Sequence, residues 1–251
     1  MLRKWMDHDA SKWLATPLGE SLLTEEGRVV EEALDGVFGE ETLQLGHWGA
    51  PRGFLKYSRT QRSNLIAEDT HEDGPSILAP LHRLPIDSDS VDSVLLPHTL
   101  EFSDRPHAIL REVHRVLRPH GHLVVLAFRP GGFWGLRRLI PGAGMPPGAD
   151  HLVSDRRLKD WLKLLDMRIH GLTRYFFRWP LPGLKGAVSS KWEQRGQAWW
   201  PELSACYMLT AEKRISTLTP VRPVWSKKPK IVAGLVEPTT RVSRIRFDQD
   251  N

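Results

Sequence analysis

Few side chains in this sequence have the type and spacing that chemistry at a site requires, and His98 is the first of them. It follows an apolar run at residues 91–96 and Pro97, and it begins the tetrad His98-Thr99-Leu100-Glu101. An imidazole exchanges a proton near neutral pH, so His98 is a weak candidate for a general base. It could equally contact a ligand or hold its loop in place.

The eleven histidines and the single cysteine form no short motif for metal binding or nucleophilic catalysis. The patterns H-x-x-x-H, H-E-x-x-H, G-x-S-x-G and G-x-x-x-x-G-K are all absent. Cys206 stands alone in an apolar setting, which excludes disulfides within the chain and cysteine-cluster metal sites and favours a buried strand thiol. The sequence therefore predicts no metal site.

His98 is positioned by a strand, helix, strand unit over residues 84–128. The run at 91–96, which is almost uniformly apolar after Asp92, is typical of a strand buried on both faces of a parallel sheet. Residues 122–128 give a second such strand. Ligands of such sheets bind at the carboxyl ends of the strands, which is where Pro97 and His98 lie.

The helix between these strands has start and stop signals. Ser103 or Asp104 can cap it, and Pro106 suits its first turn. Apolar residues recur at helical spacing until Pro119 and Gly121, where Pro119 cannot continue the helix and Gly121 tolerates a reversal.

The motifs of this unit resemble those of class I S-adenosylmethionine-dependent methyltransferases of the type 11 group. In order they are Leu84-Pro85-Ile86, the acidic loop 87–90, Val91-Asp92, His98-Thr99-Leu100-Glu101, Arg111-Glu112, Arg115-Val116-Leu117, Pro119-His120-Gly121 and residues 123–126. The small bacterial YafS-like branch looks closer still, because the similarity extends into Phe128-Arg129-Pro130 and residues 135–139 and 161–165.

The resemblance implies an α/β fold with a Rossmann-like sheet, mostly parallel with an antiparallel last strand, and helices on both faces. We expect an N-terminal helical cap over residues 1–40, a methyltransferase-like domain over 41–217 and a basic, proline-containing tail over 218–251 that stays mobile or lies along the body. Expected strands are 42–45, 63–67, 76–79, 91–96, 122–128, 167–179 and 204–214; expected helices are 11–38, broken by Pro17 and Gly19, then 52–57 and 154–165, capped by Ser154.

The resemblance also implies S-adenosyl-L-methionine as cofactor, held by a glycine turn after the first strand. The family has acidic-x-Gly-x-Gly-x-Gly where this chain has Gln44-Leu45-Gly46-His47-Trp48-Gly49-Ala50. Gly46 matches, whereas Gln44 replaces the acid, and Trp48 and Ala50 replace the later glycines. Gly46, His47, Trp48 and Gly49 are nevertheless the expected contacts of the turn.

Further cofactor contacts follow from the same resemblance. Glu68 or Asp69 would accept hydrogen bonds from the ribose hydroxyls, although a solvated acidic loop is an alternative. Leu81 and His82 would frame the adenine, because Pro80 stands where the family often has an aspartate. Pro97 and His98 would lie at the methionine end.

The sequence indicates less about the methyl acceptor and the residues that would contact it. Phe133 and Trp134, in the glycine- and proline-rich segment 131–148, could contact substrate or plug the sheet edge. Seven Lys or Arg against three Asp or Glu lie in the tail, so RNA is a second acceptor class, but no base-stacking motif supports it and a small molecule is favoured. No apolar run approaches the length of a membrane span, and we expect a cytoplasmic protein.

Two functions follow. The first is a methyltransferase that moves the methyl group of S-adenosylmethionine to an unidentified acceptor. The absence of a catalytic motif does not count against it, since aligning the acceptor with the methyl group supplies much of the rate. The alternative is a catalytically impaired methyltransferase-like binding or scaffold protein, which the altered residues Gln44, Trp48, Ala50 and Pro80 favour.

Overall fold

The computed structural model of the chain describes residues 8–50, 52–69, 74–131, 134–135, 146–149, 151–177 and 201–214. Its central feature is a seven-stranded sheet in the order β3-β2-β1-β4-β5-β7-β6. The strands are β1 Phe38–Leu45, β2 Arg59–Ala67, β3 Ile77–Leu78, β4 Val91–Pro97, β5 Leu117–Phe128, β6 Met167–Tyr175 and β7 Cys206–Lys213. All neighbours from β3 to β5 pair in parallel, and β7 runs antiparallel to both β5 and β6. The predicted fold class is confirmed.

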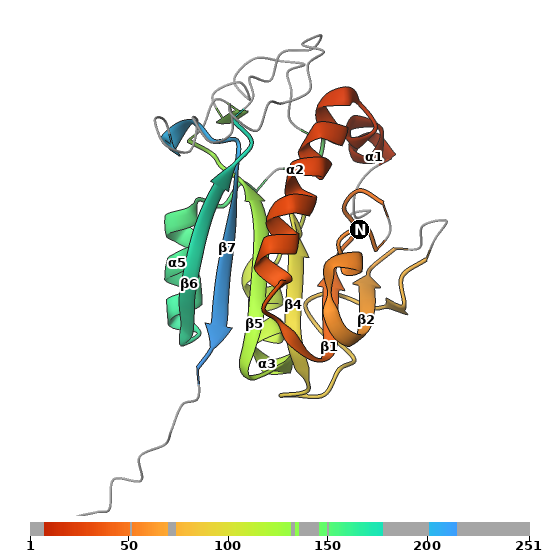
Figure 1. Cartoon of the computed structure of the whole chain (residues 1–251), viewed down its shortest axis with the longest axis vertical. Helices are drawn as coiled ribbons and strands as arrows, with labels where there is room; N and C mark the ends of the chain where they lie inside the picture. The colour runs from red at the N-terminus through yellow and green to blue at the C-terminus, as the bar shows by residue number, and fades with distance from the viewer. Residues whose placement is uncertain are drawn as a thin grey trace, which may run out of the picture. The chain divides into compact units, whose positions relative to one another are not determined.

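Helices cover both faces of this sheet. Helix α2 (Pro17–Leu34) lies on the near face in Figure 1, with α1 (His8–Leu14) packed at its upper end, and α3 (Pro106–Val116) and α5 (Asp155–Leu164) lie behind the sheet. Side chains of β5 alternate between the two layers, because successive residues of a strand point to opposite faces. Leu123 and Val125 join the core under α3 and α5, whereas Val124 and Leu126 join the core under α2.

The α1–α2 junction breaks where Pro17 predicts it. Thr16 caps α2, since its hydroxyl accepts a hydrogen bond from the N–H of Gly19 at 3.2 Å. Gly19 itself lies inside α2 and does not break it. A Cβ there would come within 2.5 Å of Leu14 Cα, so the missing side chain lets the two helices approach.

The ends of α3 differ from the sequence-based expectation. Arg105, and not Ser103 or Asp104, is the N-cap residue, and the Ser103 hydroxyl accepts from the Arg105 N–H at 3.0 Å instead. At the other end, α3 stops at Val116 and Leu117 already begins β5, so Pro119 and Gly121 lie inside that strand and do not end the helix. The left-handed residue there is His120, with φ of +66°, and not Gly121. Gly121 instead lies close to the Arg118 carbonyl, which a Cβ would approach to 2.8 Å.

The pair Glu112 and Arg115, which belongs to the motifs quoted above, has a structural role. Glu112 accepts the N–H of Leu84 at 2.9 Å, and the Arg115 guanidinium donates to the carbonyls of Leu84 and Ile86 at 3.0 and 2.8 Å. The two side chains also pair with each other at 2.9 Å. They clamp the turn before β4 onto α3, which explains why these motifs occur together.

The remaining boundaries agree with the prediction in type but not always in length. The helix expected at 52–57 is only a 3-10 turn, η1 (Leu55–Tyr57), and β1 and β2 each begin four residues earlier than expected. Ser154 caps α5 as predicted, by accepting from the Arg157 N–H. A second 3-10 turn, η2 (Pro201–Leu203), precedes β7. The division into cap, domain and tail stays a prediction, and Phe133 and the tail 218–251 lie outside the described residues.

Candidate functional site

The candidate site lies where the strand order reverses, between the carboxyl ends of β1 and β4. This is the switch point at which ligands of doubly wound sheets bind. The turn that follows β1 has left-handed glycines at both ends, with φ of +87° at Gly46 and +70° at Gly49. A Cβ on Gly49 would lie 2.7 Å from Leu23 Cδ2, so the turn packs tightly beneath α2.

Trp48, a residue of this turn, is buried among aromatic rings. Its side chain is 1% exposed, and its indole Nε1 donates to Glu26 Oε2 across 2.6 Å. Its ring packs against His98 at a centroid separation of 4.3 Å, and against Phe102 and Phe128 at 5.8 and 5.9 Å. The position that the family gives to a glycine is thus occupied by a fully packed aromatic ring.

His98 connects two buried carboxylates. Its Nε2 lies 2.7 Å from Glu26 Oε1 and its Nδ1 lies 2.7 Å from Glu101 Oε2. All three side chains are fully buried. Burial alone would lower the pKa of His98, but Glu101 and Glu26 outweigh it and raise that pKa to about 9. We therefore assign the positively charged imidazolium to His98.

Both carboxylates have further partners. The second oxygen of Glu101 accepts the Phe128 N–H at 2.5 Å, and the Tyr175 hydroxyl lies 3.4 Å from Glu26 Oε1. Burial raises the pKa of Glu101, while His98 and the Phe128 N–H oppose that rise. With both ring nitrogens engaged, His98 holds its loop and the helix α2 together. This arrangement corresponds to the loop-holding alternative and leaves no free lone pair for a general base.

Glu68 and Asp69, the two candidates for binding the ribose hydroxyls, directly follow β2 at the carboxyl edge of the sheet. Glu68 accepts the Leu81 N–H at 2.8 Å and lies 4.0 Å from His82 Nδ1. Next to it, Asp69 Oδ2 is buried and has no hydrogen-bond partner within the described part of the chain. An unpaired buried carboxylate oxygen is costly, so it marks a place where a donor is expected.

Two further predicted cofactor residues, Pro97 and Leu81, have packing roles in the structure. Pro97 is the buried last residue of β4, and Leu81 is fully buried in the core. The hydroxyl of Thr99 donates to the Leu45 carbonyl at 2.5 Å and so joins the loop after β4 to the end of β1. Trp134 is fully buried between Trp13 and Phe128, which fits the alternative that it plugs the sheet edge.

Four residues around His98 were missed from the sequence as site residues: Glu26, Glu101, Tyr175 and Cys206, whose sulfur lies within 4.8 Å of ligand atoms of Glu26 and His98. Glu26 carried a usable signal, because it lies on the same face of α2 as the buried Leu22, Val29 and Val30. A lone carboxylate on such a stripe requires a buried partner. Nothing in the sequence near Tyr175 or Cys206 indicates what they contact.

A cavity of about 630 Å³ opens next to the first turns of α3 and α5. It is lined by Asp104, Pro106, His107, Pro130, Gly135, His151, Leu152, Val153, Arg157 and Trp161. The lining follows β4 and β5, so the cavity opens at the carboxyl edge of the sheet. Its volume is in the range that small-molecule sites occupy.

Comparison with known proteins gives a consistent result. The type 11 family model, a methyltransferase domain, matches residues 54–125. The chain is 35% identical over 156 residues to the uncharacterised protein YafS of Escherichia coli K12, an alignment that covers 60% of this chain and 59% of YafS. The resemblance to the type 11 methyltransferases and to YafS is confirmed.

Solved structures show the same fold. A complex of a Haloferax volcanii methyltransferase with its activator Trm112 matches with a TM-score of 0.54 and 14% identity, covering 83% of this chain and 97% of that one. A SAM-dependent methyltransferase of Thermotoga maritima matches with a TM-score of 0.51 and 17% identity, covering 78% and 99%. Within the described residues, no helix has the length and apolar character that crossing a membrane requires.

Proposed function

We propose that this chain, which has the fold of the S-adenosylmethionine-dependent methyltransferases and matches their type 11 domain, transfers a methyl group from that cofactor to a small-molecule acceptor. One observation carries the proposal. The buried, unpartnered Asp69 Oδ2 lies at the end of β2, beside the switch point and the Gly46 turn. A ribose hydroxyl is a donor of the kind that this oxygen lacks.

The residues present suit the adenosine half of the cofactor. Asp69 and the free oxygen of Glu68 can accept from two vicinal hydroxyls, and the segment around Leu81 and His82, which is tied to Glu68, can frame the adenine. When bound, the cofactor would supply a methyl group on a sulfonium, which is a good leaving group. The protein then needs only to align the acceptor with that methyl group and to exclude water.

The methionine half does not fit the arrangement seen here, because the Trp48 indole occupies the space next to His98. Gly46 and Gly49 flank Trp48 and have left-handed backbone conformations, so the turn has conformational freedom on both sides of the ring. We therefore propose that Trp48 leaves its hydrogen bond with Glu26 when the cofactor binds. The negative charge left near Glu26 and Glu101 would favour the cationic sulfonium.

For the acceptor, the cavity near α3 and α5 favours a small molecule. Its lining combines apolar residues with Arg157, His107 and His151, which provide a few polar groups for orientation. RNA as an acceptor depended on the basic tail, which lies outside the described residues. A cytoplasmic location stays a prediction.

A second function is favoured by one observation. Trp48 is so well packed and hydrogen-bonded that the turn could be permanently closed. In that case the protein would use the methyltransferase fold as a binding or scaffold module, without methyl transfer.

Calorimetric titration with S-adenosylmethionine and S-adenosylhomocysteine distinguishes these functions. The wild type, Trp48→Gly and Asp69→Asn are compared, with Trp161→Phe as a control tryptophan in the lining of the cavity. We expect binding by the wild type, equal or tighter binding by Trp48→Gly, and roughly tenfold weaker binding by Asp69→Asn through loss of one charged acceptor.

Each other outcome has a definite meaning. Binding by Trp48→Gly alone would support the scaffold function. If the wild type and Trp48→Gly are both folded and neither binds the cofactor at millimolar concentration, the enzyme proposal fails. Strong weakening in a correctly folded Trp48→Gly variant, checked by circular dichroism, would show that the turn is not the cofactor turn.

A further inference from the structure

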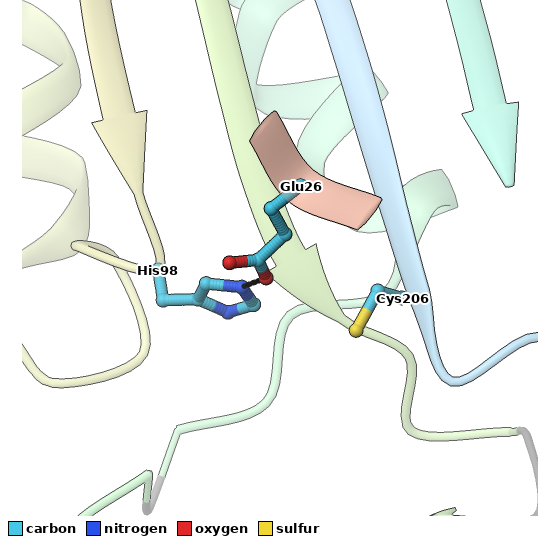
Figure 2. Close-up of side chains that lie close together, drawn as sticks. All are labelled: Glu26, His98 and Cys206. Carbon is cyan, nitrogen blue, oxygen red and sulfur yellow. Dashed lines mark hydrogen bonds and ion pairs between the residues drawn. The ribbon is translucent and has the colours of Figure 1, made fainter. Parts of the chain in front are cut away.

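We propose that Glu26, His98 and Cys206 form a binding site for one Zn²⁺ ion. The three side chains come from α2, from the loop after β4 and from the first residue of β7. Figure 2 shows them converging beneath α2, with the Glu26 carboxylate on His98 and the Cys206 sulfur nearby. Their ligand atoms all lie within 4.8 Å of one another, and all three residues are buried.

The ligand set selects the type of ion. A thiolate, an imidazole nitrogen and a carboxylate oxygen are the groups that bind Zn²⁺ in proteins. Mg²⁺ and Ca²⁺ prefer oxygen ligands alone, so a site with sulfur and nitrogen discriminates against them. Three protein ligands also leave one position of a tetrahedral ion for a further oxygen. The Tyr175 hydroxyl, 3.4 Å from Glu26 Oε1, is a neighbour that could supply it.

Two hydrogen bonds already orient the ligands. Glu101 Oε2 engages His98 Nδ1 at 2.7 Å, so His98 Nε2 faces Glu26 and the cysteine. Trp48 donates to Glu26 Oε2 and leaves Oε1 as the oxygen that faces His98. A carboxylate on the far nitrogen of a ligand histidine is the arrangement that fixes its ring orientation at zinc sites. The Phe128 N–H fixes Glu101 in turn.

The movements required are small. Zn–N and Zn–O bonds of about 2.1 Å at a tetrahedral angle separate their ligand atoms by roughly 3.4 Å. Glu26 Oε1 and His98 Nε2 are now 2.7 Å apart, so they must separate by roughly 0.7 Å while Cys206 approaches. The ion replaces the proton between Glu26 and His98 and the proton of the Cys206 thiol. Two protons leave and two positive charges enter, so the net charge of the buried cluster does not change.

The chain has a single cysteine, which gives the experiment a specific signal. The full-length protein is freed of metal with a chelator and titrated with Co²⁺, without S-adenosylmethionine. We expect one equivalent of Co²⁺ to produce a near-ultraviolet thiolate-to-cobalt band and the visible bands of a tetrahedral site. One equivalent of Zn²⁺ should abolish both, and an excess of Mg²⁺ should not.

Variants test each ligand. Cys206→Ser should remove the thiolate band, and His98→Asn and Glu26→Gln should weaken Zn²⁺ binding by more than about 100-fold. Glu101→Gln, which keeps every ligand and changes only the group that orients His98, should weaken it by roughly 10- to 100-fold. Circular dichroism before titration identifies any variant that fails to fold.

The matched control is an exposed histidine pair elsewhere. His120 and His170 both contact Glu212 on the surface, and such a group can bind Co²⁺ weakly. A His120→Ala/His170→Ala double variant should keep the thiolate band and its stoichiometry. The proposal is overturned if the wild type gives no thiolate band, or if Cys206→Ser retains tight stoichiometric Zn²⁺ binding. Because no cofactor is present, neither result bears on methyl transfer.

Discussion

The Trp48 indole donates its only N–H to the buried carboxylate of Glu26, and this bond joins the turn after β1 to the helix α2. In the methyltransferase family that this chain resembles, the glycine turn leaves room for a ligand at this position. Here the ring supplies both the packing and the hydrogen bond that a ligand would otherwise supply. The conformation of the turn and the protonation of the Glu26, His98 and Glu101 cluster are therefore coupled.

Replacing Trp48 with Phe should destabilise the fold by about 1–3 kcal/mol. The phenyl ring keeps most of the packing, but Glu26 Oε2 loses its N–H donor in a buried setting. Urea unfolding of the wild type and the variant measures the difference. Trp161→Phe, at a partly exposed indole, is the control and should cost less. Equal stability of Trp48→Phe and the wild type would mean that the bond is not formed in solution.

Glu112→Gln should lower stability at neutral pH by about 1 kcal/mol, and the difference should disappear in acid. The Arg115 guanidinium holds the pKa of Glu112 below its ordinary value, helped by the Leu84 N–H and opposed by burial. A group with a lowered pKa in the folded state stabilises above its unfolded pKa, and this contribution is lost as the pH falls through the folded value. Unfolding free energies measured from pH 7 downward test this.

The control for this pH series is Glu32→Gln, at an exposed carboxylate that pairs with Arg28 on the surface of α2. Exposed pairs contribute little, so its effect should be small at every pH. A Glu112→Gln deficit that persists unchanged into acid would contradict the clamp between Glu112 and the turn at Leu84.

Gly19→Ala should destabilise the protein by about 1–3 kcal/mol, although alanine is the better helix former. The new Cβ would meet the backbone of Trp13 and Leu14 at 2.5 Å, and backbone atoms cannot rotate away. Gly36→Ala is the matched control, because a Cβ there has no neighbour within 4 Å in the described structure. That variant should be neutral or more stable by about 0.4–1 kcal/mol. Thermal unfolding of both proteins ranks them.

His98 should remain protonated in the metal-free protein until the pH approaches about 9. Its ring N–H groups, both engaged by carboxylates, should be visible by nitrogen-15 NMR at pH 7.5, where solvent-exposed histidines are neutral. Glu101→Gln removes one of the two negative charges and should lower the pKa of His98. If the His98 signal titrates near the ordinary pKa of histidine, the imidazolium assigned to this cluster is wrong.

The fold was predictable because its signals are local. The apolar run of β4, the helical spacing in α3 and the Ser154 cap each lie within one element, and each was confirmed. Boundary errors have equally local causes. His120 adopts the left-handed conformation that glycine favours, and Arg105 caps α3 without any side-chain hydrogen bond.

The candidate site was only partly predictable, because its decisive contacts are tertiary. The sequence places Gly46, Glu68 and His98 at strand ends, and the structure brings those ends to one edge. It does not indicate that Trp48 lies beneath α2, since nothing local pairs it with Glu26. The absence of short metal motifs likewise could not reveal a cluster whose members come from three distant segments.

The place of β7 in the sheet has a consequence for how the chain assembles. Among the described residues β7 is the last strand in sequence, yet it inserts between β5 and β6 and pairs with both. Until residues 206–213 are synthesised, β5 and β6 each present an unpaired edge, and such edges invite association with other chains. Both the completed sheet and the arrival of Cys206 beneath α2 thus depend on a late, long-range step.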